Sequence, residues 1–388
     1  MNYILFDGAE RNNLLPFTYT RPVAEIRIGI LTIREKWEIT LSEKFSHLTQ
    51  DYLSEKFPTH VEAENILING SVLPNEFIID VIINLKQDEK LVYDNTVIAI
   101  GASQSEIEDN TFLSTAKKNL NLQHPAFNIK NTWDIFHLND YALRADFDLI
   151  TAGRKSQHIY APNQLIGFEN IFIEEGAKVY ASILNATAGP IYIGKNAEVM
   201  EGNLIRGPFS LGENSTLKMG SKIYGATTIG NDCKVGGELN NSVIFGFSNK
   251  AHEGYLGNSV IGEWCNLGAD TNTSNLKNNY SNVKVWSFAE GKYIDTGLQF
   301  CGLAMGDHSK CSINTQFNTG TVAGVCANIF GEGFPPKNIA NFSWGGAKGF
   351  EKFELDKAIE IAGRVYTRRN MTFDETEQRI FEYLYKHL

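Results

Sequence analysis

Branched apolar residues recur at every sixth position through the middle of this 388-residue chain, and this period is the strongest pattern in the sequence. The run consists of Ile193, Val199, Ile205, Leu211, Leu217, Ile223, Ile229 and Val235. Neither a helix nor an ordinary strand has a period of six, whereas the hexapeptide repeats of a parallel β-helix do. Three repeats are expected to form one coil of a triangular prism, with the branched residue pointing inward. The pattern therefore predicts a parallel β-helix.

The residues between these positions support the same prediction. Glycine often follows the apolar residue, as at Gly194 and Gly212, and a small side chain such as Cys233 often stands four residues after it. After Val235 the register shifts by two residues and is expected to resume at Val243, Tyr255, Ile261 and Leu267. The β-helix is predicted to begin near residue 160 and to end near residue 330, with a protruding asparagine-rich loop at 271–283.

The flanking regions carry other patterns. Strands are expected at residues 3–6, 65–68 and 96–100, and helices at 25–37, 74–86 and 132–143, and this alternation predicts a parallel sheet. Two further helices are expected at 354–368 and 372–388, the second with a capping box from Thr372 to Glu375, and together they are predicted to cap the last coil. We therefore predict an α/β domain at 1–155, a β-helix at 156–335 and a helical cap at 336–388.

Charge and cysteine content narrow the classes of partner. A formal net charge of −10 argues against nucleic acid or an anionic membrane as the main partner. Five cysteines without a CxxC pair favour reduced thiols and a cytoplasmic location, and no signal peptide or membrane span is expected. The flat faces of such a prism suit packing against copies of itself, so a homotrimer is predicted.

One segment departs from the hexad pattern and carries candidate chemistry. Residues 248–257 read S-N-K-A-H-E-G-Y-L-G, and I-G-E-W-C-N-L-G-A-D-T follows at 261–271. This stretch resembles the acetyltransferase half of the bifunctional UDP-N-acetylglucosamine diphosphorylase/glucosamine-1-phosphate N-acetyltransferase family, which carries S-K-x-x-H-L-x-Y-L-G-D and then I-G-x-x-x-N-I-G-A-G-T. The resemblance implies a left-handed β-helix that uses acetyl-CoA as cosubstrate. It also implies that His252 is the catalytic base, Tyr255 a sugar-phosphate ligand, and Asn266 and Asn275 polar contacts to the substrate.

The chemistry of N-acetylation supports His252 independently. An amino sugar is largely an ammonium ion near neutrality, so a base must take a proton as the nitrogen attacks the thioester, and histidine suits this task. The alternative is a structural or surface histidine. The family's phosphate-binding arginine and lysine have no counterpart in Gly236-Gly237-Glu238, and the spacing leaves Lys218, Lys222 and Lys250 as substitutes. A zinc site between prisms would need a third histidine beside His252 and His308, and the β-helix offers none.

The N-terminal half resembles the nucleotidyltransferase domain of the same family in the order of its motifs. The family's G-x-G-T-R loop is matched by Gly8-Ala9-Glu10-Arg11, its R-P-K by Arg21-Pro22-Val23 and its G-D-x-P by Gly70-Ser71. Each of these changes removes a phosphate or metal contact, so a reduced domain of the kind found in Bacteroidetes-type variants is predicted. Arg11, Arg21 and Asp7 are the candidate nucleotide ligands, and Mg²⁺ is expected only if this domain is active.

Three functions follow from these observations. The first is acetyl-CoA-dependent N-acetylation of an amino sugar phosphate on the β-helix. The second is a sugar-1-phosphate nucleotidyltransferase whose β-helix is an oligomerisation scaffold. The third is a non-catalytic regulatory subunit that binds nucleotide sugars.

Overall fold

The computed structural model describes residues 1–388, and the chain divides into two compact units. Unit 1 consists of Met1–Leu14, Thr20–Ile26 and Leu31–Lys130, and unit 2 of Leu15–Tyr19, Arg27–Ile30 and Asn131–Leu388. Two short N-terminal segments therefore belong to unit 2. In one of them the Gly29 N–H donates to Asn139 Oδ1 at 2.7 Å, and in the other the Phe17 ring packs 5.5 Å from that of Phe245. The domain boundaries predicted at residues 155 and 335 stay predictions.

Unit 1 is built on one six-stranded sheet in the order β2-β1-β3-β5-β4-β6. The strands are β1 (Asn2–Phe6), β2 (Phe45–Leu48), β3 (Glu64–Asn69), β4 (Glu89–Tyr93), β5 (Thr96–Ser103) and β6 (Lys118–Asn121). The expected strands exist, but the expectation of a purely parallel sheet is wrong, because β5 runs antiparallel to both β3 and β4. Asp94 and Asn95 join β4 to β5 with φ of 44° and 61°, the left-handed backbone that a two-residue hairpin requires.

The helices of unit 1 are short. They are α1 (Ile33–Leu41), α2 (Glu76–Ile82), α3 (Gln104–Glu108) and α4 (Phe112–Thr115), with 3₁₀ turns η1 (Ala9–Leu14), η2 (Val23–Glu25) and η3 (Asp51–Leu53). The helix expected at 25–37 begins only at Ile33, because Thr32 forms a capping box with Glu35 and because Gly29 has φ +74°. The core of the sheet includes Ile4, Leu67 and Ile100.

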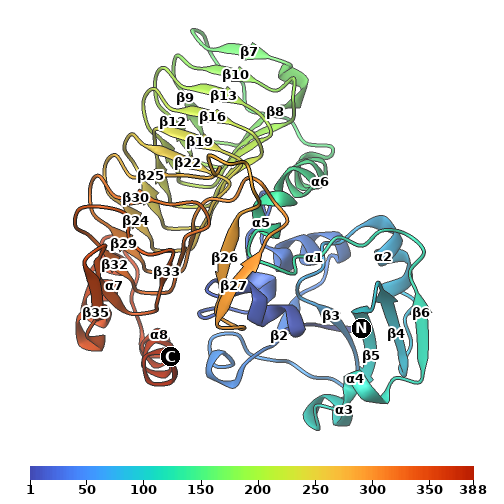
Figure 1. Ribbon diagram of the computed structural model, residues 1–388. Helices are drawn as coiled ribbons and strands as arrows, with labels where there is room; N and C mark the ends of the chain where they lie inside the picture. The colour runs from blue at the N-terminus through green and yellow to red at the C-terminus, as the bar shows by residue number, and fades with distance from the viewer. The chain divides into compact units, whose positions relative to one another are not determined.

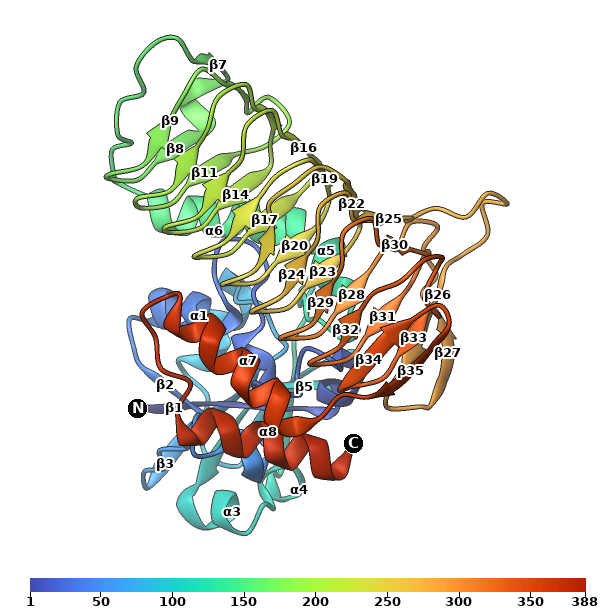
Figure 2. The same cartoon turned by 90° about the vertical axis from the view of Figure 1, so that its left-hand side faces the viewer.

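Unit 2 opens with two helices. The helix expected at 132–143 is split at Leu138 into α5 (Asp134–His137) and α6 (Asn139–Thr151). Asn139 at the start of α6 donates to the Ala226 carbonyl at 2.9 Å, and its Oδ1 accepts the Thr228 hydroxyl at 3.2 Å. These bonds fix α6 against β17 (Thr227–Ile229) of the β-helix (Figure 2).

The predicted left-handed parallel β-helix is confirmed (Figure 1). The first sheet contains β7 (Gln164–Ile166), β10 (Ile183–Asn185), β13 (Leu204–Arg206), β16 (Lys222–Tyr224), β19 (Glu238–Asn240) and β22 (Tyr255–Gly257). The second contains β8 (Ile171–Ile173), β11 (Ile191–Ile193), β14 (Phe209–Leu211), β17 (Thr227–Ile229), β20 (Val243–Ile244), β23 (Val260–Ile261), β28 (Ala304–Met305), β31 (Val322–Ala323) and β33 (Asn338–Ile339). The third contains β9 (Lys178–Val179), β12 (Glu198–Val199), β15 (Thr216–Leu217), β18 (Lys234–Val235), β21 (Asn249–Lys250), β24 (Asn266–Leu267), β29 (Lys310–Cys311), β32 (Asn328–Ile329), β34 (Ser343–Gly346) and β35 (Gly349–Lys352).

The residues of the hexad run point into the prism. All eight, from Ile193 to Val235, are at most 2% exposed and belong to one core cluster. Ile193 pairs with Leu211, and Leu211 with Ile229, so one coil spans 18 residues as three hexads require. Beyond Val235 the inward positions are Leu239, Ile244 and Leu256, which pair with Ile223, Ile229 and Leu239. The expected register at Val243 and Tyr255 is therefore off by one residue, because two repeats are shortened to four and five residues.

The predicted loop at 271–283 lies in a longer insertion that carries a hairpin. The chain leaves the prism after β25 (Asn272–Thr273) and forms the antiparallel pair β26 (Lys284–Ser287) and β27 (Lys292–Asp295) before it returns to β28. β25 pairs with β30 (Gln316–Phe317), which continues the prism beyond the insertion.

The two C-terminal helices, α7 (Leu355–Thr367) and α8 (Glu375–His387), pack on the flank of the later coils (Figure 2). The Tyr366 ring is stacked on Trp264 with centroids 4.0 Å apart, and Phe381 meets His308 edge-on at 4.9 Å. This aromatic ladder lies along the side of the prism, and Phe381 and Tyr385 of α8 also meet Phe342, next to β34 of the last coil, edge-on at 6.1 and 5.1 Å. That the two helices cap the last coil stays a prediction. Phe350 on β35 packs against the core. The cap of α8 is Asp374, whose side chain accepts from the Glu377 N–H, and not Thr372.

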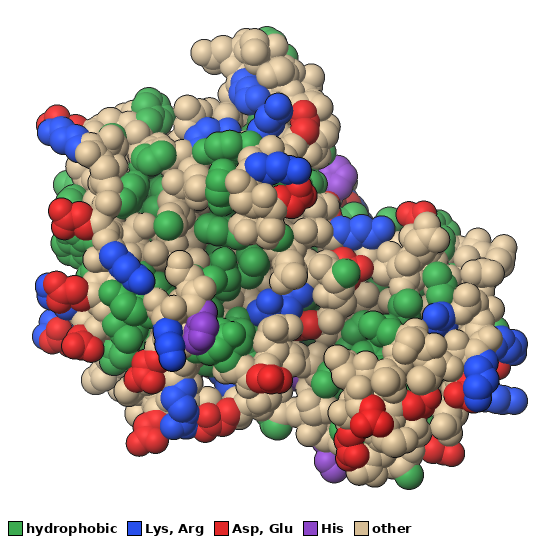
Figure 3. Space-filling model, turned by 60° about the horizontal axis from the view of Figure 1, so that its bottom comes forward, with side chains coloured by type: hydrophobic (Ala, Val, Ile, Leu, Met, Phe, Trp, Pro, Cys, Tyr) green, Lys and Arg blue, Asp and Glu red, His purple; other side chains and the backbone are tan.

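None of the helices combines the length and the apolar character that a membrane span requires. Basic and acidic side chains are interspersed on the face shown in Figure 3. All five cysteines are buried and unpaired.

Candidate functional site

His252 lies in the turn at residues 251–254, which leads from β21 of the third sheet to β22 of the first. Its side chain is exposed, as a base that must reach a bound substrate requires. The turn runs close to the next coil, because a Cβ on Gly254 would lie 2.2 Å from the Thr271 carbonyl oxygen, and Gly254 has φ +119°. The Glu253 carbonyl accepts the Asp270 N–H at 3.0 Å. The turn that carries His252 is therefore held by its neighbours.

Lys250 precedes this turn and points into the prism. It pairs with Val235 in the row of inward residues and is 1% exposed. Its Nζ donates to the Gly236 carbonyl at 3.0 Å and to the His252 carbonyl at 2.8 Å. The structure thus places Lys250 beneath His252, on the inner side of the turn and away from the surface that a substrate would meet.

Tyr255 and Asn275 come together on the outer side of the first sheet. Asn275 Nδ2 donates to the Tyr255 hydroxyl at 3.0 Å and to Asn258 Oδ1 at 2.8 Å. Gly257 leaves the space for this cluster, since a Cβ there would lie 2.3 Å from the Tyr255 hydroxyl oxygen. The phenol and the two amides form a polar cluster three residues along the chain from His252. Sequence reasoning missed Asn258, because its contact with Asn275 is made between two consecutive coils and is not visible in the sequence.

The strand register shows which side chains continue the row of Tyr255. Tyr255 pairs with Glu238, and Glu238 with Lys222, so these three side chains stand side by side on the outer face of the first sheet. Glu238 accepts the Tyr224 hydroxyl at 2.5 Å, and this bond, with burial, raises the pKa of Tyr224. Lys222 is exposed, whereas Lys218 lies in the turn after β15 and is half-buried. Of the three candidate lysines, Lys222 alone shares the Tyr255 row.

Asn266 lies on a different face. It is exposed on β24 of the third sheet, where it pairs with Asn249 and Lys310. Asn249 Oδ1 accepts from Arg369, just beyond the end of α7, at 3.3 Å. Within one chain the structure does not bring Asn266 to the Tyr255 cluster.

In unit 1, Asp7 and Arg11 form a buried pair after β1. Asp7 Oδ1 accepts the Val23 N–H at 2.8 Å, and Oδ2 accepts the Thr49 hydroxyl at 2.6 Å. Arg11 Nε lies 3.3 Å from Asp7 Oδ2. Burial raises the pKa of Asp7 against the opposing effect of these partners. Both oxygens of Asp7 are engaged within unit 1.

Arg21 is buried, with 6% of its surface exposed. Ser71, at the position of the family's aspartate, is fully buried and donates to Asn69 Oδ1 at 2.9 Å. No group of three His, Cys, Asp or Glu side chains is placed to hold a metal ion. At the end of β3, Asn69 therefore accepts from Ser71 and donates to Glu10 Oε2 at 3.4 Å.

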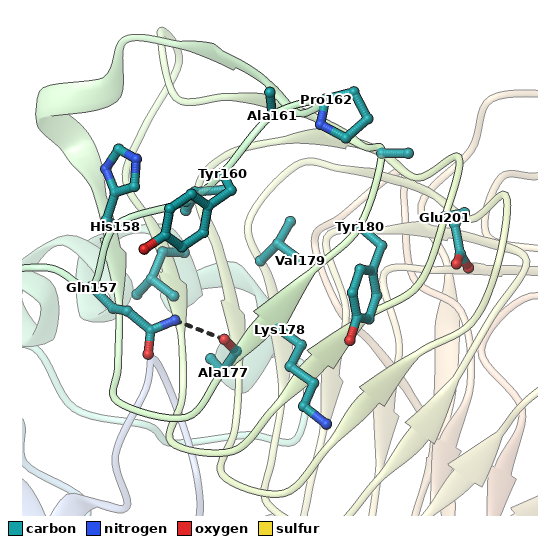
Figure 4. Close-up of a pocket in the computed structure, with 13 residues that line it drawn as sticks. Gln157, His158, Tyr160, Ala161, Pro162, Ala177, Lys178, Val179, Tyr180 and Glu201 are labelled. Atoms are coloured by element: carbon teal, nitrogen blue, oxygen red, sulfur yellow. Dashed lines mark hydrogen bonds between the residues drawn. The ribbon is translucent and has the colours of Figure 1, made fainter.

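A cavity of about 430 Å³ lies at the N-terminal end of the prism (Figure 4). Tyr160, Val179 and Tyr180 line it, and Gln157 Nε2 closes one side by donating to the Ala177 carbonyl at 2.9 Å. Its β9 wall is four strands from β21 in the third sheet, or roughly 19 Å at ~4.8 Å per strand. The cavity is thus remote from His252.

Together, these observations define a chain with a mixed α/β unit and a hexapeptide β-helix that carries an exposed histidine beside a Tyr-Asn-Asn cluster. Residues 3–155 match the family model described as "Sugar nucleotidyl transferase", and the predicted resemblance is confirmed by this match and by the relatives below.

Three curated relatives are bifunctional proteins. A "Bifunctional sugar-1-phosphate nucleotidylyltransferase/acetyltransferase" of Sulfurisphaera tokodaii is 37% identical over 144 residues, which cover 37% of this chain and 35% of that protein. A "Bifunctional protein GlmU" of Methanocaldococcus jannaschii is 34% identical over 87 residues, or 22% of this chain and 21% of that protein. The protein of the same name from Methanococcus maripaludis is 33% identical over 87 residues, or 22% and 20%. The matches thus span about a third or less of these relatives.

Among solved structures, an Arabidopsis UDP-N-acetylglucosamine acyltransferase covers 55% of this chain and 80% of its own, at 15% identity and a TM-score of 0.25. Values this low support no argument about function.

Proposed function

We propose that the β-helix transfers an acetyl group from acetyl-CoA to the amino group of an amino sugar phosphate, with His252 as the general base. The observation that carries this proposal is the exposed His252 side chain on a held turn, three residues before the Tyr255–Asn275–Asn258 cluster. The names of the bifunctional relatives, which include acetyl and nucleotidyl transfer, support the same class of reaction.

The proposed chemistry assigns one task to the imidazole. The amine nitrogen of the acceptor attacks the carbonyl carbon of the thioester while His252 takes a proton from that nitrogen. The carbon–sulfur bond then breaks, and the leaving thiolate receives the proton from the imidazolium, which gives CoA and the N-acetylated sugar. Backbone N–H groups are the usual donors to the developing oxyanion in such a step.

The acceptor is proposed to lie along the row from Tyr255 to Lys222. The Tyr255–Asn275–Asn258 cluster offers hydroxyl and amide groups to the sugar, and Glu238 is an acceptor for its hydroxyl groups. Lys222, two strands from Tyr255, is the cation for the phosphate, because the strand spacing of ~4.8 Å places it about 10 Å away, on the scale of a sugar phosphate.

The position of Asn266 on another face favours a site that two subunits complete. In the proposed homotrimer the acyl-CoA arm lies between adjacent prisms, so that the third sheet of one chain faces the first sheet of the next. Asn266 of one subunit and Tyr255 of its neighbour then contact the same substrates. A cytoplasmic location is part of this proposal, because the cytoplasm supplies acetyl-CoA.

The experiment that tests His252 is a comparison of two exposed histidines. His252→Gln should lower kcat for acetyl transfer by ~10²–10⁴, the usual loss on removal of a general base. His158→Gln, at the far end of the prism, is the matched control and should leave kcat unchanged. Equal activity of the two variants would reduce His252 to a surface residue.

Sugar-1-phosphate nucleotidyl transfer is the second candidate, and the family match over residues 3–155 favours it. We propose that this activity is weak or absent here. Ser71 replaces a carboxylate, Val23 a lysine and Ala9-Glu10 part of the glycine loop, whereas phosphoryl transfer depends on positioned cations and metal ligands. Any retained nucleotide binding should depend on Arg11 and Arg21, with Mg²⁺ needed only for turnover. A non-catalytic nucleotide-sugar-binding subunit is the outcome if both activities are absent.

A further inference from the structure

The row of inward residues in the third sheet is apolar except at one coil. Val179, Val199, Leu217 and Val235 precede Lys250 in this row, and Leu267 and Cys311 follow it. A lysine at a core position loses the hydration of its ammonium group, which is a cost that an aliphatic side chain of similar length does not have. The position is therefore not explained by packing of the core.

The Lys250 ammonium links the turns of two consecutive coils. Its two hydrogen bonds run to the Gly236 carbonyl, on the coil before, and to the His252 carbonyl, on its own turn. Gly237 leaves room for this arrangement, because a Cβ there would lie 2.9 Å from the His252 carbonyl oxygen and 3.0 Å from Nζ. Both bonds are made from inside the prism, while the imidazole of His252 points outward.

The groups that face this ammonium are few. Glu253 and Asp270 act on it from the turns, and Cys311 from the next coil but one. Burial lowers the pKa of Lys250 to about 8, against the attraction of these groups. The lysine is thus placed where its hydrogen bonds are strong but its charge is costly.

We infer that Lys250 is a positioning residue for the general base, which fixes the main chain of the His252 turn from the core side. This inference rests on the proposed function for the role of His252 in acetyl transfer. The hydrogen bonds themselves do not depend on that function. A displacement of a catalytic group by about 1 Å can cost on the order of 10²-fold in rate, so an anchor two residues from the base bears directly on turnover.

Lys250→Met is the test variant, because methionine has a similar length and suits an apolar core. Lys310→Met is the matched control. Lys310 is a half-buried lysine on β29 of the third sheet, beyond the insertion, and it donates to the His308 carbonyl at 2.7 Å. It pairs with Asn266 and so lies in the outward row, whereas Lys250 lies in the inward row. Both variants remove a hydrogen bond from a lysine to a carbonyl two residues away. Only in Lys250→Met does that carbonyl belong to His252, and only there is the bond that links two coils through the Gly236 carbonyl also lost.

Two readouts separate the inference from the proposed function. The first is amide hydrogen exchange, measured by mass spectrometry. Lys250→Met should raise exchange in peptides that cover 236–238 and 251–255, and Lys310→Met should not. The second is kinetics. Lys250→Met should lower kcat for acetyl transfer roughly 10–100-fold with KM within about twofold, and in the His252→Gln background it should add no further loss.

Each outcome has one meaning. Unchanged exchange at 251–255 in Lys250→Met would overturn the inference, whether or not the chain is an acetyltransferase. Raised exchange with unchanged kcat, or an equal loss of kcat in Lys310→Met, would also overturn it and leave Lys250 a structural residue. If Lys250→Met raises exchange but the wild-type chain shows no acetyl transfer, the proposed function is overturned and, with it, the catalytic part of the inference.

Discussion

At the scale of single residues, the segment around His252 contains one residue that faces solvent and one that faces the core. His252 is exposed on a turn, whereas Lys250, two residues earlier, is inside the prism and bonded to the main chain of that turn. The sequence identified His252, Tyr255 and Asn275 through the motif. It offered Lys250 as a substrate ligand, because a string of letters does not show which side of a strand a residue occupies. The strand register showed this, and it also brought Glu238 and Lys222 into the row of Tyr255.

Buried charge in unit 1 gives a prediction at the same scale. Glu25 accepts hydrogen bonds from Arg34 and from His47, the latter at 2.9 Å. Although burial favours its neutral form, these partners lower the pKa of Glu25 from 4.5 to about 2. A lowered pKa stabilises the fold above pH ~4.5, and this contribution is lost as the pH falls from there to about 2. Glu25→Gln should therefore lower the free energy of unfolding by about 2–3 kcal/mol at pH 7.

The measurement is thermal unfolding by calorimetry at a series of pH values. The difference between wild type and Glu25→Gln should narrow as the pH falls below 4.5. Glu62→Gln, at an exposed carboxylate beside His60, is the control and should change little at any pH. A difference for Glu25→Gln that stayed constant down to pH 2.5 would contradict the electrostatic explanation.

At the scale of elements, the sequence predicted the repeat well and its irregularities poorly. The hexad period predicted the inward residues from Ile193 to Val235 correctly, because all eight are branched apolar side chains that repeat at the same place in each hexad. The period could not show where a turn is shortened. Val243 and Ile244 are both apolar and both buried, so composition alone does not decide which of them faces inward.

Other elements were missed for local reasons that the sequence does contain. Thr32 and Glu35 carry the capping box that starts α1, and Asp94-Asn95 is a two-residue hairpin signal that implies antiparallel strands. The flank position of α7 and α8 has no such local signal, because it depends on aromatic residues contributed by several coils.

The packing of α7 gives a prediction for this scale. Tyr366 is 4% exposed and lies in stacked contact with Trp264 and His308. Tyr366→Ala should lower the free energy of unfolding by about 3 kcal/mol, since it leaves a cavity against the prism. Tyr280→Ala, at a tyrosine that is 65% exposed, is the matched control and should cost little. Calorimetry of both variants checks this, and similar stabilities would show that α7 contributes nothing to the stability of the coils.

At the scale of the whole molecule, the β-helix carries both the predicted repeat fold and the residues proposed for acetyl transfer. The exposed face of the first sheet carries Tyr255, and the third sheet carries Asn266. If two subunits complete one site, assembly and activity are linked. The fold of the prism follows from the hexad repeat of one chain. The contacts between prisms depend on surface residues, which the repeat does not determine.

Light scattering coupled to size-exclusion chromatography tests this link. The chain should elute with three times the mass of one subunit, and catalytic activity should fall on dilution to concentrations at which the trimer dissociates. A monomer over a wide range of concentrations, with unchanged specific activity, would rule out a site shared between prisms.

We propose that the β-helix, and not the N-terminal unit, carries the main activity. The most direct measurement incubates the wild-type chain with acetyl-CoA and glucosamine-1-phosphate, and separately with Mg²⁺, a nucleoside triphosphate and a sugar-1-phosphate. We predict that free CoA and N-acetylated sugar phosphate form in equal amounts in the first reaction, and that pyrophosphate release in the second is slow or absent. Rapid pyrophosphate release that is lost in Arg21→Ala, without any acetyl transfer, would instead assign the main activity to the N-terminal unit.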